Sequence, residues 1–181
     1  NVLQYKAPEL IASECAERGP YAAAFDAGCG TGLLGPPLRN HVKRLVGADL
    51  SQNMVDKARE LGCYDALVVG DLLDAALYDE AFDLIAAADV LCYFGDLRDV
   101  LGALAAKTAP GGDLIFTVET LNEGEWRWVL QAIERYAHHP DYVRDVATAI
   151  GLEPRDAIPF QPRMESGLPV RGTLHVLHKP R

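Results

Sequence analysis

A run of glycines that begins with an acidic residue is the part of this chain best suited to chemistry. Asp26 is followed by Gly28, Gly30 and Gly32, and the run comes directly after the apolar segment 21–25. Glycines at alternate positions let a backbone turn sharply and approach a ligand more closely than a Cβ atom would permit, while the carboxylate stands at a strand end. The run therefore predicts binding of a small, charged cofactor of the nucleotide type.

The segments that must position this run alternate between apolar and amphipathic, which is typical of βαβ units around a mostly parallel sheet. We expect strands at 21–25, 44–48, 66–69, 82–87 and 113–118, and helices at 9–18, 31–42, 52–61, 96–107 and 141–150. The segments 155–162 and 171–178 are interpreted as two further strands, whose short connection requires an antiparallel pair. The predicted fold class is α/β, with a Rossmann-like, seven-stranded, mostly parallel sheet, an antiparallel C-terminal hairpin and helices on both faces.

Prolines, glycines and one serine mark the ends of these elements. Pro36 and Pro37 fall where the helix at 31–42 should make its first turns, so that helix is expected to be delayed or kinked. Ser51 precedes the helix at 52–61 and is expected to cap it. The segment 109–112, which contains Pro110 and two glycines, is expected to turn sharply into the fifth strand.

Length and composition limit the classes of function. The chain has 181 residues, of which 49% are hydrophobic, and this suits one domain spanning 1–181. A formal charge of -9 without a Lys/Arg cluster weighs against nucleic acid as the main partner. No membrane span or signal peptide is evident. Neither a metal site nor a disulfide framework is suggested, and a cytoplasmic location is expected, because no two cysteines are close among Cys15, Cys29, Cys63 and Cys92.

Four features together resemble the class I S-adenosylmethionine-dependent methyltransferases over nearly the whole chain. They are the acid–glycine run 26–32, Asp49 after the second strand, Asp71 after the third, and the Pro-Gly-Gly turn 110–112 before the fifth. The resemblance implies the class I methyltransferase fold, with S-adenosylmethionine as methyl donor and S-adenosylhomocysteine as product.

More narrowly, the segments 88–90, 93–97 and 135–138 resemble a group of predicted bacterial methyltransferases often attached to tetratricopeptide repeats. This resemblance implies a fused or partner repeat domain. Because the chain begins at Asn1 without a methionine, we expect it to be the C-terminal catalytic part of a longer protein.

The resemblance assigns one group of residues to the nucleoside part of the cofactor. Asp49 is placed where a carboxylate accepts hydrogen bonds from both ribose hydroxyls. Leu50 and Met54 are expected to pack on the adenine faces, and Asp71 with Leu72 to meet its amino edge. Met54 in the core of its helix is an equally good interpretation.

A second group is assigned to the methionine part. Gly28, Gly30 and Ala88 are expected to offer their backbone, and Asp26 to face the amino group, although a strand-end cap is the alternative for Asp26. The set of cofactor-binding residues also includes Cys29 as a small residue, with a reactive thiol as the alternative, Asp89, and Tyr5 in a segment that the family folds over the pocket.

The acceptor side is expected to follow the fourth strand. Tyr93 is expected to face the methyl acceptor, or else to form an aromatic lid with Phe94. Arg135 is expected to pair with an anionic substrate and His138 to act as general base or acceptor-orienting group, although a lone histidine is more often structural. These three are the candidate catalytic residues. The insert that contains Trp128 fits a strand and a helix equally well.

The predicted function is methylation of a small molecule, with oxygen slightly favoured as the acceptor. The segment 89–93 lacks the Asn/Asp-Pro-Pro-Tyr pattern of the families that methylate adenine or glutamine amino groups. A cofactor-binding regulatory or scaffold module without catalysis is the first alternative. An NAD(P)-binding oxidoreductase is the second, because the segment 30–35 satisfies G-x-G-x-x-G and Asp49 follows by about 20 residues.

Overall fold

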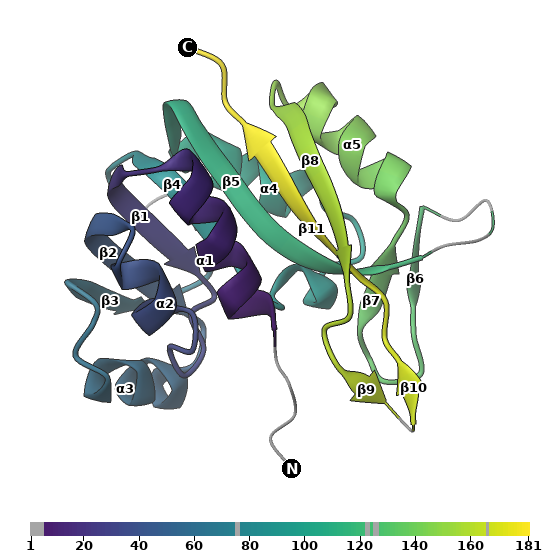
Figure 1. Ribbon diagram of the computed structural model, residues 1–181, viewed down its shortest axis with the longest axis horizontal. Coiled ribbons are helices and arrows are strands. Elements are labelled where there is room, and N and C mark those ends of the chain that lie inside the picture. The colour runs from purple at the N-terminus through teal and green to yellow at the C-terminus, as the bar shows by residue number, and fades with distance from the viewer. Residues whose placement is uncertain (1–5, 75–76, 122–123, 125–126, 166) are drawn as a thin grey trace.

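A single sheet with helices on both faces forms the body of the molecule (Figure 1). The computed structural model describes residues 6–74, 77–121, 124, 127–165 and 167–181. The main path of the sheet has the order β3-β2-β1-β4-β5-β11-β8. In chain order these strands are β1 Tyr21–Ala27, β2 Val42–Asp49, β3 Ala66–Val69, β4 Phe82–Ala87, β5 Thr108–Thr120, β8 Glu153–Phe160 and β11 Gly172–His178.

The pairing of these strands confirms the predicted fold class. The neighbours from β3 to β5 are parallel, whereas β11 is antiparallel to both β5 and β8. Chain order reverses between β1 and β4, and in open α/β sheets ligands bind in the crevice beside such a reversal.

Helices cover the two faces of the sheet separately. Figure 1 shows α1 (Ala7–Arg18) on one face and α4 (Arg98–Lys107) on the other, where α5 (Pro140–Ala149) also packs. Successive strand residues point to opposite faces, so Leu84 belongs to the apolar cluster that contains Ile11 of α1, while Ile85 belongs to the cluster that contains Leu101 of α4. The remaining helices are α2 (Gly35–Arg39), α3 (Gln52–Glu60) and the short 3-10 turn η1 (Leu91–Tyr93). Within the ranges described, every helix is too short or too polar to cross a membrane.

The helix predicted at 31–42 is much shorter in the structure, and it begins late, as the two prolines led us to expect. Only Gly35–Arg39 is helical, and Pro36 and Pro37 occupy its first turn. A proline is tolerated there because its missing N–H would have no helical partner in any case. The chain between Gly30 and Gly35 is therefore free to curve around the end of β1.

Two other local predictions need correction. Ser51 stands at the N-cap of α3, but its hydroxyl makes no capping hydrogen bond. The turn at 110–112 lies inside β5, where the register with β4 moves from the pair Phe82–Thr108 to the pair Leu84–Asp113. Gly111, with a φ of 80°, makes this bulge possible and donates its N–H to the carbonyl of Lys179 at 2.7 Å.

The insert after β5 forms a hairpin, which settles a pattern that the sequence left open. Strands β6 (Trp128–Leu130) and β7 (Tyr136–His138) are antiparallel, and β7 pairs with the end of β5. A second small hairpin, β9 (Met164–Glu165) with β10 (Leu168–Pro169), precedes β11. Both hairpins lie toward the same end of the sheet in Figure 1.

Candidate cofactor and substrate site

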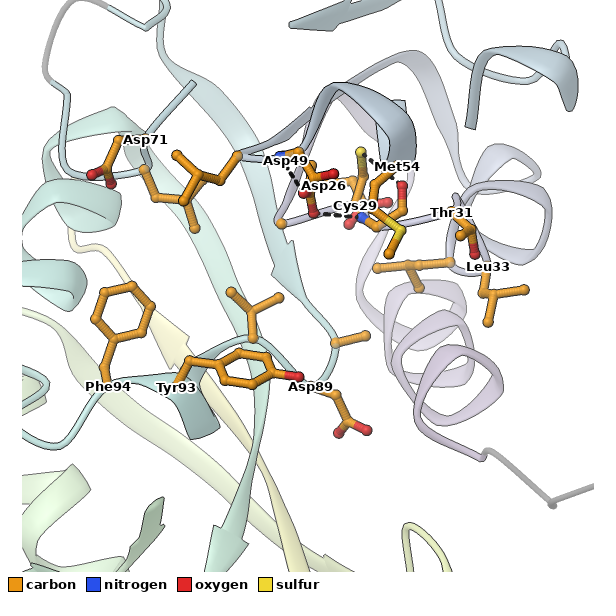
Figure 2. Close-up of a pocket in the computed structure, with 18 of the residues that line it drawn as sticks. Asp26, Cys29, Thr31, Leu33, Asp49, Met54, Asp71, Asp89, Tyr93 and Phe94 are labelled. Atoms are coloured by element: carbon orange, nitrogen blue, oxygen red, sulfur yellow. Dashed lines mark hydrogen bonds between the residues drawn. The ribbon is translucent and has the colours of Figure 1, made fainter. Parts of the chain in front are cut away.

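A cavity of about 760 Å³ opens at the carboxyl ends of β1, β2 and β4. Apart from Tyr5, which lies outside the described residues, the structure brings every residue predicted to bind the cofactor to its lining: Asp26, Gly28, Cys29, Gly30, Asp49, Leu50, Met54, Asp71, Leu72, Ala88 and Asp89. Of the candidate catalytic residues, Tyr93 and Arg135 also line it. Figure 2 shows Asp26, Asp49 and Met54 on one side, with Tyr93 and Phe94 across from them.

The glycine loop that forms one wall depends on backbone conformations that favour glycine. Gly28, Gly30 and Gly32 have φ values of 75°, 53° and 86°. The N–H groups of Gly28 and Cys29 both donate to the carbonyl of Ala48, at 2.9 and 2.8 Å, which ties the loop to the end of β2. A Cβ on Gly30 would meet no atom within 4 Å, so this stretch of backbone is open to a ligand.

Replacing Gly28 by alanine is expected to lower the free energy of unfolding by about 3 kcal/mol. A positive φ costs a non-glycine residue about 1 kcal/mol, and the added methyl would overpack the site for a further ~2 kcal/mol. The clash is with Val90, whose Cγ2 would lie 2.5 Å from the new Cβ. Gly30→Ala is the matched control, because it carries the φ cost alone. Urea denaturation of both variants measures the difference, and equal losses would contradict a role for the Val90 contact.

Asp49 is oriented by the backbone around it. Its Oδ2 accepts from the N–H of Gly30 at 2.9 Å and its Oδ1 from the N–H of Ser51 at 2.9 Å. At the start of α3 the Asp49 carboxylate thus accepts from the Ser51 N–H, whereas the Ser51 hydroxyl makes no capping hydrogen bond. Each carboxylate oxygen can accept a second bond. The side chain therefore lines the cavity with capacity for two adjacent hydroxyl donors, which fits a ribose.

Asp26 is almost completely buried beneath the loop and is held by a residue that the sequence did not single out. The hydroxyl of Tyr64 donates to Asp26 Oδ2 at 2.6 Å. Burial raises the pKa of Asp26 to about 7, the Tyr64 hydrogen bond opposes that rise, and the charge of Asp49 adds to it. A cation placed beside Asp26 would favour its charged form. Asp26 is accordingly suited to an ammonium group.

Apolar side chains line the part of the cavity expected to hold the adenine. Leu50 is 75% exposed and Met54 is 39% exposed, so Met54 faces the cavity and is not in the core of its helix. Leu72 is buried and also lines the cavity. Asp71 is exposed, and its Oδ1 accepts from the N–H of Leu73 at 2.9 Å. Exposed apolar side chains with a few polar groups at their edge are typical of a small-molecule site.

The opposite wall contains an aromatic residue paired with a cation. Tyr93 ends η1 and is 60% exposed. The guanidinium carbon of Arg135 lies 5.3 Å from the centre of the Tyr93 ring, and Arg135 Nη2 donates to the Tyr93 hydroxyl at 3.2 Å. Phe94 lines the cavity beside Tyr93. Because Tyr93 itself faces the cavity, both interpretations of this residue, acceptor contact and lid, remain compatible with its position.

Asp89 follows β4 in a strained backbone conformation. It has a φ of 56°, which is uncommon for a residue with a Cβ and concentrates at functional sites. Thr117 holds it in place, because the Asp89 N–H donates to Thr117 Oγ1 at 3.0 Å and Thr117 Oγ1 donates to Asp89 Oδ1 at 3.2 Å. Burial raises the pKa of Asp89, while the charge of Arg135 opposes that rise.

The structure does not bring His138 to the cavity lining. Its side chain is completely buried, and Nε2 lies 2.9 Å from the carbonyl oxygen of Phe94 and 3.0 Å from that of Gly95. Burial lowers the pKa of His138. The geometry thus gives His138 a structural task, which is to hold the loop that carries Phe94. Its neighbour His139 caps α5, where its Nδ1 accepts from the N–H of Asp141 at 3.2 Å.

Sequence reasoning missed several residues of this site. Arg163 and Val90 line the cavity, and Tyr64 supports Asp26 from below. Arg163 lies in the loop before β9, far along the chain from the motifs. For Tyr64 the only signal is indirect, because Gly35 and Gly47 leave room for its ring: a Cβ on either would approach it to 2.7 or 3.0 Å.

The fold and the glycine loop at the end of β1 together define a class I methyltransferase fold. A comparison with family models agrees, since the model described as "Methyltransferase domain" matches residues 25–116. The chain therefore belongs to this methyltransferase-domain family.

Curated relatives and solved structures extend the similarity. Nodulation protein S of Rhizobium tropici is 34% identical over 105 residues, covering 55% of this chain and 44% of that protein. Malonyl-[acyl-carrier protein] O-methyltransferase of Salmonella typhimurium is 33% identical over 131 residues, covering 70% and 51%. The chain spans about half the length of these curated relatives. Magnesium protoporphyrin IX methyltransferase from Synechocystis, solved with bound SAH, superposes with a TM-score of 0.79 at 17% identity, covering 97% of this chain and 83% of that one.

Proposed function

We propose that this chain binds S-adenosylmethionine and transfers its methyl group to a small molecule, releasing S-adenosylhomocysteine. The observation that carries the proposal is the doubly oriented carboxylate of Asp49 beside the open glycine loop, in a chain of the methyltransferase-domain family. Oxygen is the acceptor atom that we favour, and the O-methyltransferases among the curated relatives support this choice.

The residues of the chain divide the work between binding and alignment. The bound cofactor supplies an electrophilic methyl on a sulfonium, so the protein has mainly to align the acceptor and exclude water. Asp26 and the glycine loop hold the amino acid end, Asp49 the ribose, and Leu50 with Met54 the adenine. Tyr93 and Phe94 form the wall that an acceptor would meet. His138 acts through the Phe94 loop as a positioning residue.

The resemblance to methyltransferases attached to tetratricopeptide repeats carries narrower proposals about the domain, its location and its partners. Residues 1–181 are one methyltransferase domain, closest to the predicted bacterial methyltransferases associated with tetratricopeptide repeats. A fused or partner repeat domain accompanies it, in a cytoplasmic protein without nucleic-acid or membrane partners. The segments 88–90 and 135–138 support this grouping.

Calorimetric titration distinguishes the proposal from the dinucleotide alternative. We expect the protein to bind S-adenosylhomocysteine and to give no heat with NAD or NADP under the same conditions. Binding of NAD in preference to S-adenosylhomocysteine would overturn the proposed function. Release of S-adenosylhomocysteine from S-adenosylmethionine in the presence of a metabolite pool separates an enzyme from a regulatory module, because a module would bind the donor without consuming it.

A further inference from the structure

Two arginines from separate elements meet at the acceptor side of the cavity. Arg135 lies in the turn between β6 and β7, and Arg163 lies in the loop between β8 and β9. Both line the cavity, and both approach the same oxygen, Glu119 Oε1, at 3.4 and 2.8 Å. Asp26, Asp49 and Met54, which are assigned to the cofactor, lie across the cavity from Tyr93 and Phe94, whereas Asp89 lies beside Tyr93 (Figure 2). Neither arginine is among the residues assigned to the cofactor.

Glu119 serves as the anchor of this pair. Its side chain is only 5% exposed, and a buried carboxylate is tolerated when its oxygens are hydrogen-bonded and its charge is paired. Short contacts satisfy both oxygens, since Gln131 Nε2 donates to Oε2 at 2.6 Å and Arg163 Nη2 donates to Oε1 at 2.8 Å. Glu119 therefore does not depend on Arg135 for its stability.

Arg135 makes only long contacts with carboxylates. Its Nη1 lies 3.4 Å from Glu119 Oε1 and 3.9 Å from Asp89 Oδ2, and neither contact has the short, paired geometry that arginine and carboxylate prefer. Its third contact is the exposed hydroxyl of Tyr93. A guanidinium has five N–H donors. Arg135 is thus placed at the cavity wall with capacity for an incoming anion.

We propose that Arg135 and Arg163 together bind a carboxylate of the methyl acceptor, an inference that rests on the proposed function. A carboxylate matches the planar fork of a guanidinium and adds a single negative charge beside Glu119 and Asp89, whereas a dianionic phosphate would add two. Tyr93 and Phe94 supply an apolar wall next to the arginines. The acceptor class is therefore a small acid with one carboxylate beside an apolar or aromatic body.

Matched pairs of acids and their primary amides test the proposal directly. Hexanoate with hexanamide and benzoate with benzamide are titrated, by ligand-observed NMR, into the protein saturated with S-adenosylhomocysteine. We expect each acid to bind at least tenfold more tightly than its amide. Arg163→Gln should abolish that preference while keeping a hydrogen bond to Glu119, whereas Arg163→Lys should retain part of it. Arg127→Gln is the matched control, since Arg127 is exposed next to β6 and is not among the residues that line the cavity.

The outcomes separate this inference from the function on which it rests. If S-adenosylhomocysteine fails to bind, the proposed function is wrong. If it binds with unchanged affinity in every variant but no acid is preferred over its amide, the carboxylate site is wrong and the function stands. Equal losses in Arg163→Gln and Arg127→Gln would also overturn the inference, because they would indicate a general effect of charge.

Discussion

Replacing Asp49 by alanine is expected to weaken binding of S-adenosylhomocysteine about 100-fold, measured by calorimetry. Hydrogen bonds to a charged acceptor contribute about 1.5–3 kcal/mol each, and the loss of two ribose contacts at the low end of that range gives about 3 kcal/mol, or roughly two orders of magnitude in affinity. The carboxylate also holds the N–H groups of Gly30 and Ser51, so part of the loss acts through the shape of the loop.

A ligand lacking the ribose hydroxyls separates the direct loss from the indirect one. The 2′,3′-dideoxy analogue of S-adenosylhomocysteine should bind wild type more weakly than the parent, and Asp49→Ala should no longer distinguish the two ligands. Asp71→Ala is a suitable control, because Asp71 is assigned to the adenine edge and not to the ribose, so this variant should still prefer the parent ligand by the wild-type factor. If Asp49→Ala still preferred the parent ligand by the wild-type factor, the ribose assignment would be wrong.

The main strands could be predicted because their apolar runs are bounded by residues with strong turn preferences. The segments 66–69 and 82–87 form strands with the expected limits, since Gly70 closes the first and Ala87 gives way to a strained turn at Asp89. The predicted extent of the helix at 31–42 was wrong for a local reason, because Pro37 cannot enter a helix interior. The turn expected at 109–112 was wrong for a non-local reason, since β4 pairs with β5 on both sides of Pro110 and β11 pairs with residues 113–119 beyond it.

The candidate site also has a part that the sequence predicts and a part that it does not. The cofactor side is built from residues that follow β1, β2, β3 and β4, and the carboxyl ends of parallel strands meet at one edge of a sheet, so motif order alone brings Asp26, Asp49, Asp71 and Asp89 together. The acceptor side depends on tertiary contacts that no local pattern encodes. Arg163 reaches Glu119 from 44 residues away. His138 lies in a motif, but the motif does not reveal that the fold buries its ring away from the cavity lining.

Affinity for S-adenosylhomocysteine is expected to fall about tenfold for each pH unit below 7. The pKa of Asp26 is raised to about 7 by burial, so the free protein holds a proton there in mildly acidic solution. The cofactor's amino group is a cation and favours the carboxylate, which means that binding below pH 7 must release this proton. Calorimetry in two buffers of different ionisation enthalpy measures that release, which should approach one proton at pH 6 and vanish at pH 8.

Asp26→Asn provides the control, and stability provides a test of opposite sign. Asparagine can still accept from Tyr64 but does not titrate, so this variant should bind weakly and without the pH dependence. The folded pKa of Asp26 lies above its unfolded value of 3.8, so the free wild-type protein holds more protons than its unfolded chain between pH 4 and 7. Its stability relative to Asp26→Asn should therefore rise as pH falls through that window, while its affinity for S-adenosylhomocysteine falls. If both quantities fell together, the ionisation responsible would lie elsewhere and the assignment of Asp26 to the amino group would be wrong.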